Sequence, residues 1–134
     1  MSDPGQKPTI PYKHLYVDRD GISHFADAAL TEFAFKSLSS ASQWLGYKHT
    51  GEMTAQFVVL PPGWVGDWHE NPKPQWIIPL SGAWYVEAMD GTRHVFGPGD
   101  FHFGEDQNCR TVDGRTGHLS GTVGDAPCVQ IIVQ

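Results

Sequence analysis

A short proline-rich segment places a histidine and a glutamine where they could share a task. In "WVGDWHENPKPQW", residues 64–76, His69 lies between tryptophans, and Pro72 and Pro74 precede Gln75. Because prolines restrict the backbone, the corner can aim His69 and Gln75 at one point. An imidazole and an amide held in that way can bind a divalent metal ion or take part in proton transfer. The alternative interpretation is that His69 only fills a turn.

The composition is that of one folded domain. The chain has 134 residues, of which 40% are hydrophobic, enough for a single core. Acidic residues outnumber basic ones by 15 to 9, so the net charge of -6 repels phosphate backbones and nucleic acid is not expected as a partner. No apolar run suits a membrane span or a signal peptide, and Cys109 and Cys128 do not suggest a disulfide framework. We therefore expect a cytoplasmic protein that has no membrane partner.

Turn residues divide most of the chain into short runs that read as strands. Asp20-Gly21 and Asp90-Gly91 are hairpin signals, whereas Pro61-Pro62-Gly63 and Ser81-Gly82 end apolar runs. Residues 1–13 read as a flexible amino-terminal arm, and residues 14–134 as a single domain. The mixed pattern of residues 26–50 predicts irregular structure with a helical turn. The strand-like runs, which predict an all-β sandwich or barrel, are 14–25 (a hairpin), 53–60, 75–80, 83–96 (a second hairpin), 101–103, 118–123 and 128–134.

The spacing around His69 resembles the first motif of the cupin family, G-x5-H-x-H-x3or4-E-x6-G. The matching positions are Gly63, His69, Gln75 and Gly82, with Asn71 in place of the second histidine and Gln75 in place of the glutamate. The segment "FGPGDF", residues 96–101, is similar to the start of the second cupin motif. Residues 54–134 as a whole resemble small single-domain cupins. The resemblance implies a cupin jelly-roll barrel, with two antiparallel sheets around one cavity.

The resemblance also implies a third ligand beside His69 and Gln75. The position counted from the second motif falls on Arg110, whose guanidinium stays protonated and cannot bind a metal. His118, which opens the strand after the long loop 104–117, could take its place. The implied metal ligands are therefore His69, Gln75 and His118, and the ion would be zinc, manganese, iron or nickel. Because Gln75 replaces a carboxylate, affinity for the ion is expected to be reduced.

Strand alternation and the resemblance together define a substrate pocket. Alternate residues share one face of a strand, so Gln75 pointing inward takes Ile77 with it. The resemblance places Trp84 inside. The apolar face of 101–105 is expected to be the core face, which puts His102 on the opposite face in a structural role. On this interpretation Glu105 joins His69 and His118 as a catalytic group. The pocket residues are expected to be Ile77, Trp84, Phe101 and Phe103.

Each site residue also has a structural alternative. Gln75 could satisfy a buried backbone group, and Glu105 could be a solvated loop carboxylate. The role of His118 depends on the lengthened loop before it. The sequence leaves these alternatives open.

These observations favour a small-molecule enzyme that uses proton transfer, of the lyase, isomerase or cyclase type, on a partly apolar or aromatic substrate. A metal-dependent dioxygenase is disfavoured because the motif lacks the carboxylate and the second histidine. A non-catalytic module that binds a small ligand is the alternative from another class. Residues 14–25, expected at an open sheet edge, and the resemblance both suggest a homodimer.

Overall fold

All regular structure in the described part of this protein is β-strand. The computed structural model describes residues 5–37 and 41–134, and no helix occurs within those ranges. It follows that the described residues contain no helix that could cross a membrane. The all-β class predicted from the turn pattern is confirmed.

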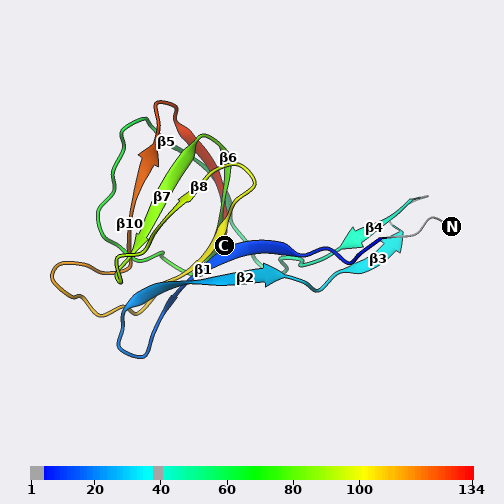
Figure 1. Cartoon of the computed structure of the whole chain (residues 1–134), viewed down its shortest axis with the longest axis horizontal. Helices are drawn as coiled ribbons and strands as arrows, with labels where there is room; N and C mark the ends of the chain where they lie inside the picture. Colours follow the sequence, from blue (N-terminus) through cyan, green and yellow to red (C-terminus); the bar gives the residue numbers. More distant parts are fainter. Residues whose placement is uncertain (1–4, 38–40) are drawn as a thin grey trace.

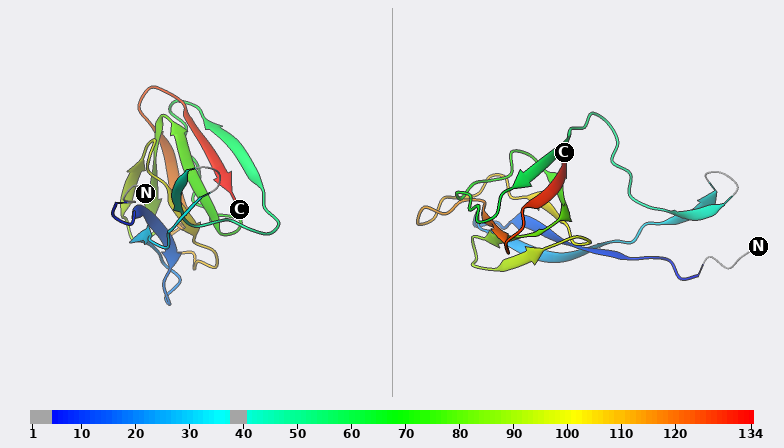
Figure 2. Two further views of the ribbon diagram at one scale, coloured as in Figure 1. Left: turned by 90° about the vertical axis from the view of Figure 1, so that its right-hand side faces the viewer. Right: turned by 90° about the horizontal axis from the view of Figure 1, so that it is seen from above.

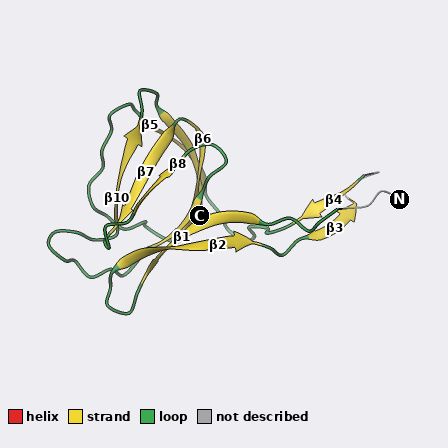
Figure 3. Cartoon of the chain, viewed as in Figure 1, coloured by secondary structure: helices red, strands yellow, loops and turns green. Residues whose placement is uncertain are grey.

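Three sheets are formed, with strand orders β2-β1-β9-β6-β11-β5, β10-β7-β8 and β3-β4 (Figures 1 and 3). Most neighbours are antiparallel, but β1 runs parallel to β9. The strands are β1 (Ile10–Val17), β2 (Ser23–Leu30), β3 (Ala34–Ser37), β4 (Ser42–Leu45), β5 (Ala55–Leu60), β6 (Gln75–Ser81), β7 (Ala83–Ala88), β8 (Arg93–Phe96), β9 (His102–Glu105), β10 (His118–Val123) and β11 (Cys128–Val133).

The six-stranded and three-stranded sheets enclose the core between them. Each strand contributes alternate residues to this interior, which for β7 are Trp84, Val86 and Ala88. The opposing sheet contributes Leu15 and Ile77. No strand is shared between the two sheets. Residues 64–69, in the connection between β5 and β6, form backbone hydrogen bonds with β10 of the smaller sheet.

Glycines make two of the close turns that frame this body. Gly63 and Gly82, the outer positions of the motif around His69, have φ of 74° and 72°. A side chain is strained in that left-handed region. At Gly82 an added Cβ would also lie 2.2 Å from the carbonyl oxygen of Pro127. Both motif glycines therefore have a conformational reason to be glycine.

An extended arm leaves the body along the β1–β2 hairpin. The β3–β4 hairpin lies at its far end, well away from the two larger sheets in each view (Figures 1 and 2). The irregular structure predicted for residues 26–50 is found at 31–33 and 46–50, but the prediction is wrong for the rest of the described part, because β2 continues to Leu30, β3 and β4 follow, and no helical turn forms there. Residues 38–40 lie outside the described residues. Pairing along the hairpin outweighs the weak local pattern here.

The hairpin also changes two expectations for the amino-terminal region. β1 begins at Ile10 and pairs with Leu30, so residues 10–13, predicted as part of a flexible arm, belong to a strand. β1 has β2 on one side and β9 on the other, so of these two hairpin strands only β2 lies at an edge of the six-stranded sheet. The segment 14–25 is therefore not an open edge along its whole length.

The six-stranded sheet is apolar on both faces. Its outer face carries a cluster in which Tyr12 stacks on Phe101 and meets Trp76 edge-on, and Trp76 also packs against Phe103. On β5 the outward residues Phe57 and Val59 remain 71% and 59% exposed. A sheet with apolar residues on both faces is typical of one that is covered on both sides.

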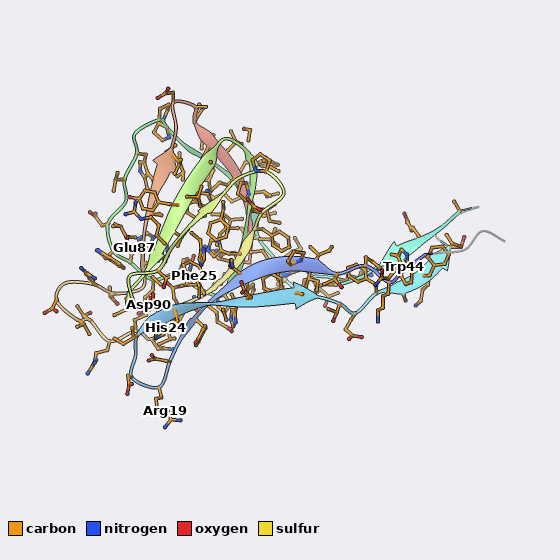
Figure 4. All side chains as sticks on the ribbon, in the orientation of Figure 1. Arg19, His24, Phe25, Trp44, Glu87 and Asp90 are labelled. Atoms are coloured by element: carbon orange, nitrogen blue, oxygen red, sulfur yellow. The ribbon has the colours of Figure 1, made fainter. Side chains whose placement is uncertain are left out.

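His24 connects two turns that belong to different sheets. Its Nδ1 lies 2.9 Å from Asp90 Oδ2 in the β7–β8 turn, and its Nε2 lies 2.6 Å from Asp18 Oδ2 in the β1–β2 turn. Figure 4 shows His24 beside Asp90 where the two hairpins meet, with Arg19 turned away at the tip. Both nitrogens can donate only in the imidazolium form. Burial alone would lower the pKa of His24, but the bonds to both carboxylates outweigh this and raise it.

This geometry predicts a pH-dependent contribution of His24 to stability. Because the pKa of His24 is raised on folding, its stabilisation is complete below the unfolded value of 6.5 and is lost as pH rises through the folded pKa. The pKa values of Asp18 and Asp90 are lowered, so both carboxylates stay ionised well into the acid range. In urea unfolding, His24→Gln should therefore lower the free energy of unfolding more at pH 5.5 than at pH 8.5.

His49→Gln is the matched control, since the hydrogen bond and the ring contact of His49 in the described structure are both with Tyr47. It should show no such difference between the two pH values. Equal losses for His24→Gln at both pH values would contradict the ionic role of His24.

Candidate functional site

His69 and His118 lie side by side. The two residues form an isolated antiparallel bridge, with N···O distances of 3.0 and 2.9 Å between their backbones, and their ring centroids are 4.7 Å apart. Gly117 allows this approach, because a Cβ at that position would lie 2.2 Å from the carbonyl oxygen of His69. The chain thus brings together two histidines that the sequence separates widely.

Each imidazole has its Nδ1 anchored. His69 Nδ1 lies 2.7 Å from the Asp67 carbonyl oxygen, which can only accept, so Nδ1 carries the proton. His118 Nδ1 lies 2.7 Å from Asp106 Oδ2 and donates to that carboxylate. In the neutral form both rings therefore hold a lone pair at Nε2. His69 is exposed and His118 is buried, so the pair extends from the surface into the protein interior.

Asp106 is the group that orients His118, and the sequence argument missed it. It is fully buried, and its Oδ1 accepts bonds from the backbone N–H and the side-chain amide of Asn71, at 2.9 and 2.8 Å. Burial would raise the pKa of Asp106, but the bonds from His118 and Asn71 lower it overall, so the carboxylate stays ionised. Its position twelve residues before His118 was the only signal, and "GEDQN" reads as an ordinary polar loop.

Asn71 and Gln75 extend the same network. Gln75 donates from Nε2 to Asn71 Oδ1 at 2.7 Å, and its Oε1 accepts from Gln134 Nε2 at 2.5 Å. Gly104 makes room for Asn71, since a Cβ there would lie 2.3 Å from the Asn71 amide nitrogen. Asn71, at the position of the second motif histidine, therefore holds Asp106, and Gln75 holds Asn71.

Glu105 does not join the two histidines. It points to the outer face of the six-stranded sheet, where Oε1 lies 2.8 Å from His14 Nε2. The reason is the register of β9: His102 pairs with Ile77 and Gly104 with Gln75, so these positions face inward and Glu105 faces outward. The prediction of Glu105 as a catalytic group is corrected accordingly.

The same register divides the predicted substrate pocket. Trp84 and Ile77 are 5% and 2% exposed and face the interior. Phe101 and Phe103 lie outside with Trp76. The expectation that the phenylalanines mark the core face is wrong because both faces of this sheet are apolar. His102, assigned to the opposite face from the core, is the inward residue and is 1% exposed.

Two grooves stand out on the described surface, and neither is lined by His69 or His118. One of about 240 Å³ lies between the β1–β2 hairpin and β8, with Lys13, Asp27, His94 and Phe96 in its walls. The other, of about 290 Å³, lies on the outer sheet face and is lined by Leu30, Tyr47, Trp76 and Phe101, among others. The single cavity expected around His69, Gln75 and His118 is not one of these grooves.

The predicted metal ligands do not fit an ion as a set of three. Both polar atoms of Gln75 are engaged by Asn71 and Gln134, which leaves the two Nε2 atoms of His69 and His118. Among residues 5–37 and 41–134, no group of three or more His, Cys, Asp or Glu side chains could hold a metal ion. A catalytic site normally supplies three protein ligands. The imidazoles of His69 and His118 are therefore considered as proton-transfer groups.

No protein-family model matches the chain, and no curated protein matches it. Six chains of solved structures do. Two are crystal structures of the capsular polysaccharide assembling protein CapF from Staphylococcus aureus, one in space group C2221, each with 16% identity and a TM-score of 0.35. They cover 77% and 76% of this chain, which spans only 30% and 28% of theirs. At this TM-score the likeness supports no argument about function.

Because both polar atoms of Gln75 are already hydrogen-bonded, we expect divalent metal ions to stabilise the protein little. A site saturated at a hundredfold excess over its dissociation constant would stabilise the fold by about 2.7 kcal/mol. We expect zinc, manganese, iron(II) and nickel to give no comparable rise in the melting temperature of chelator-treated protein, because two imidazoles without a third donor bind weakly. His69→Ala serves as the control. A large rise in the parent that disappears in His69→Ala would restore the three-ligand interpretation.

Proposed function

We propose that this protein is a small-molecule acid–base enzyme of the lyase, isomerase or cyclase type, built on a cupin jelly-roll fold. The fold proposal rests on the motif spacing, the left-handed glycines at Gly63 and Gly82, and two facing sheets around an apolar interior. The reaction proposal rests on one observation, the pair of open Nε2 atoms on His69 and His118.

His118 is the base in this proposal. Its Nε2 takes a proton from the substrate, and the imidazolium that forms is stabilised by the ionised Asp106 carboxylate at Nδ1. The same carboxylate fixes the tautomer and the ring plane before the reaction begins. This is the carboxylate–imidazole arrangement that serves general bases in many enzymes.

His69 is the partner that exchanges protons with solvent. The two rings are 4.7 Å apart, so both can lie beside one small substrate. This spacing suits one acid and one base acting in turn. His69 returns a proton to the substrate at a second atom, and no redox partner is needed.

The proposed chemistry predicts solvent exchange at an activated C–H bond. The protein should catalyse exchange of the α-hydrogens of some member of a panel of small neutral ketones and hydroxyketones in D₂O, followed by loss of the proton NMR signal. His118→Gln should slow this exchange by about 100-fold or more, the usual range for loss of a general base. Asp106→Asn should slow it too, since it leaves the ring without its anionic partner.

His14→Gln is the matched control, because His14 lies on the outer sheet face with Glu105. It should exchange at the parent rate. Exchange that is equally fast in His118→Gln would rule out the proposed base. Absence of exchange across the panel, together with tight binding of one of its members, would instead favour the non-catalytic binding module.

We also propose that the protein is a homodimer, in which a second copy covers the outer face of the six-stranded sheet. Phe57 and Val59 on β5 are exposed there, and the apolar groove beside Trp76 continues the same face. The groove lining is mostly apolar and includes Ile78 and Val133. This face takes the place of edge pairing through residues 14–25, because β1 is already paired on both sides and only residues 23–25, in β2, remain at the edge.

Phe57→Glu should convert the dimer into a monomer in sedimentation velocity, because burying the new carboxylate without a partner is unfavourable. The melting temperature of the isolated subunit should change little, since Phe57 is 71% exposed. Val95→Glu, at a residue 57% exposed on β8 in the other sheet, is the control and should leave the dimer intact. A monomeric parent protein would contradict the proposal.

A further inference from the structure

The interior between the two sheets contains polar side chains that the acid–base pair does not use. Trp84, His102, Ser120 and Gln130 all face inward and are at most 5% exposed. Their inward direction follows from the register, since His102 pairs with Ile77 and Ser120 with Val86, both core residues. An interior intended only for packing would place apolar residues at such positions.

His102 is the most unusual of these residues. Its ring stacks on Phe96 at 5.0 Å and lies 5.6 Å from Trp84, and its buried Nδ1 has no hydrogen-bond partner among the described residues. Burial, with a smaller effect of the nearby His118, lowers the pKa of His102 to about 3. The imidazole is therefore neutral, and one of its nitrogens is an acceptor.

Trp84 presents a second buried atom in the same condition. Its Nε1–H is inaccessible and lacks a partner in the described structure. Buried polar groups without partners destabilise a fold and are rare. The described residues contain three, of which Trp76 Nε1 lies on the outer-face side, so Trp84 and His102 are the two that share the interior. A phenylalanine at either position would remove the unsatisfied atom. The polar atoms therefore have a use that packing does not supply.

We propose that Trp84 and His102 form the inner part of the ligand site and recognise the hydroxyl group of a small, neutral, ring-shaped molecule. A hydroxyl oxygen can accept from the Trp84 N–H while its hydrogen is donated to His102. The rings of Phe25 and Phe96, which pack around His102, suit an apolar body. A carboxylate would be unfavourable, because no Lys or Arg side chain is buried in this interior among the described residues.

The groove between the β1–β2 hairpin and β8 offers an approach to these atoms. Phe96 lines this groove and also stacks on His102, so it contacts both. On this proposal a ligand reaches His102 and Trp84 from the groove of about 240 Å³ by displacing Phe96, which is 3% exposed. The inference deepens the proposed function and rests on it, since it names the substrate class for the same interior that His118 faces.

The test uses phenol as the probe, with toluene and benzoate as matched compounds that lack the neutral hydroxyl. Calorimetric titration of the parent should show phenol binding at least tenfold tighter than toluene or benzoate. His102→Phe and Trp84→Phe should each weaken phenol binding at least tenfold and leave toluene binding unchanged. Without ligand, His102→Phe should melt at the parent temperature or above, since it removes an unsatisfied buried nitrogen.

Phenol that binds the parent no tighter than toluene, or equally well to His102→Phe and Trp84→Phe, would overturn the proposal. So would a lower melting temperature of His102→Phe, because the imidazole would then serve the fold itself. The comparison of phenol with toluene needs only the parent, so it decides the matter even where a variant fails to fold. His118→Gln should keep phenol binding while losing hydrogen exchange, which separates failure of this inference from failure of the proposed reaction.

Discussion

The buried Asp106 carboxylate holds the candidate site together. It accepts hydrogen bonds from His118 and twice from Asn71, and through Asn71 it positions Gln75 and the carboxyl-terminal Gln134. Removing one partner of a buried charge costs about 3–5 kcal/mol, so these residues behave as a unit. The loops at one end of the two sheets are thereby tied to β6, β10 and the end of β11. In the proposed function, this arrangement directs His118 Nε2 toward the substrate.

Glycines give this network its space. Gly104 accommodates the Asn71 amide, and Gly117 brings the backbone of β10 against His69. In each case a side chain would collide with a polar group already committed to the network. The geometry of the candidate site thus depends on Gly104 and Gly117, which lack side chains.

The two-sided apolar character of the six-stranded sheet explains most of the wrong expectations. In a half-exposed strand, the apolar face identifies the core. In β9 both faces are covered, the inner by Phe96 and Trp84 and the outer by Tyr12 and Trp76, so Phe101 and Phe103 gave the wrong direction. Because the predicted alternation was shifted by one residue, His102 was assigned to the outer face, although it is among the most buried side chains described. Glu105 was misplaced for the same reason.

The sequence by itself determined the all-β class and most of the strands, because turn chemistry at Asp20-Gly21, Asp90-Gly91 and Pro61-Pro62-Gly63 is local. It also singled out His69 and Gln75, since spacing within a short motif can be read directly, and the family resemblance added His118 in place of the counted position, Arg110. Only the tertiary structure decided that Asp106 accepts a hydrogen bond from His118 and that both polar atoms of Gln75 are hydrogen-bonded. It also decided that the rings of His102 and Trp84 pack together in the interior. These facts depend on pairings between strands far apart in the chain, and each residue's neighbours across a sheet are set by register rather than by its own type.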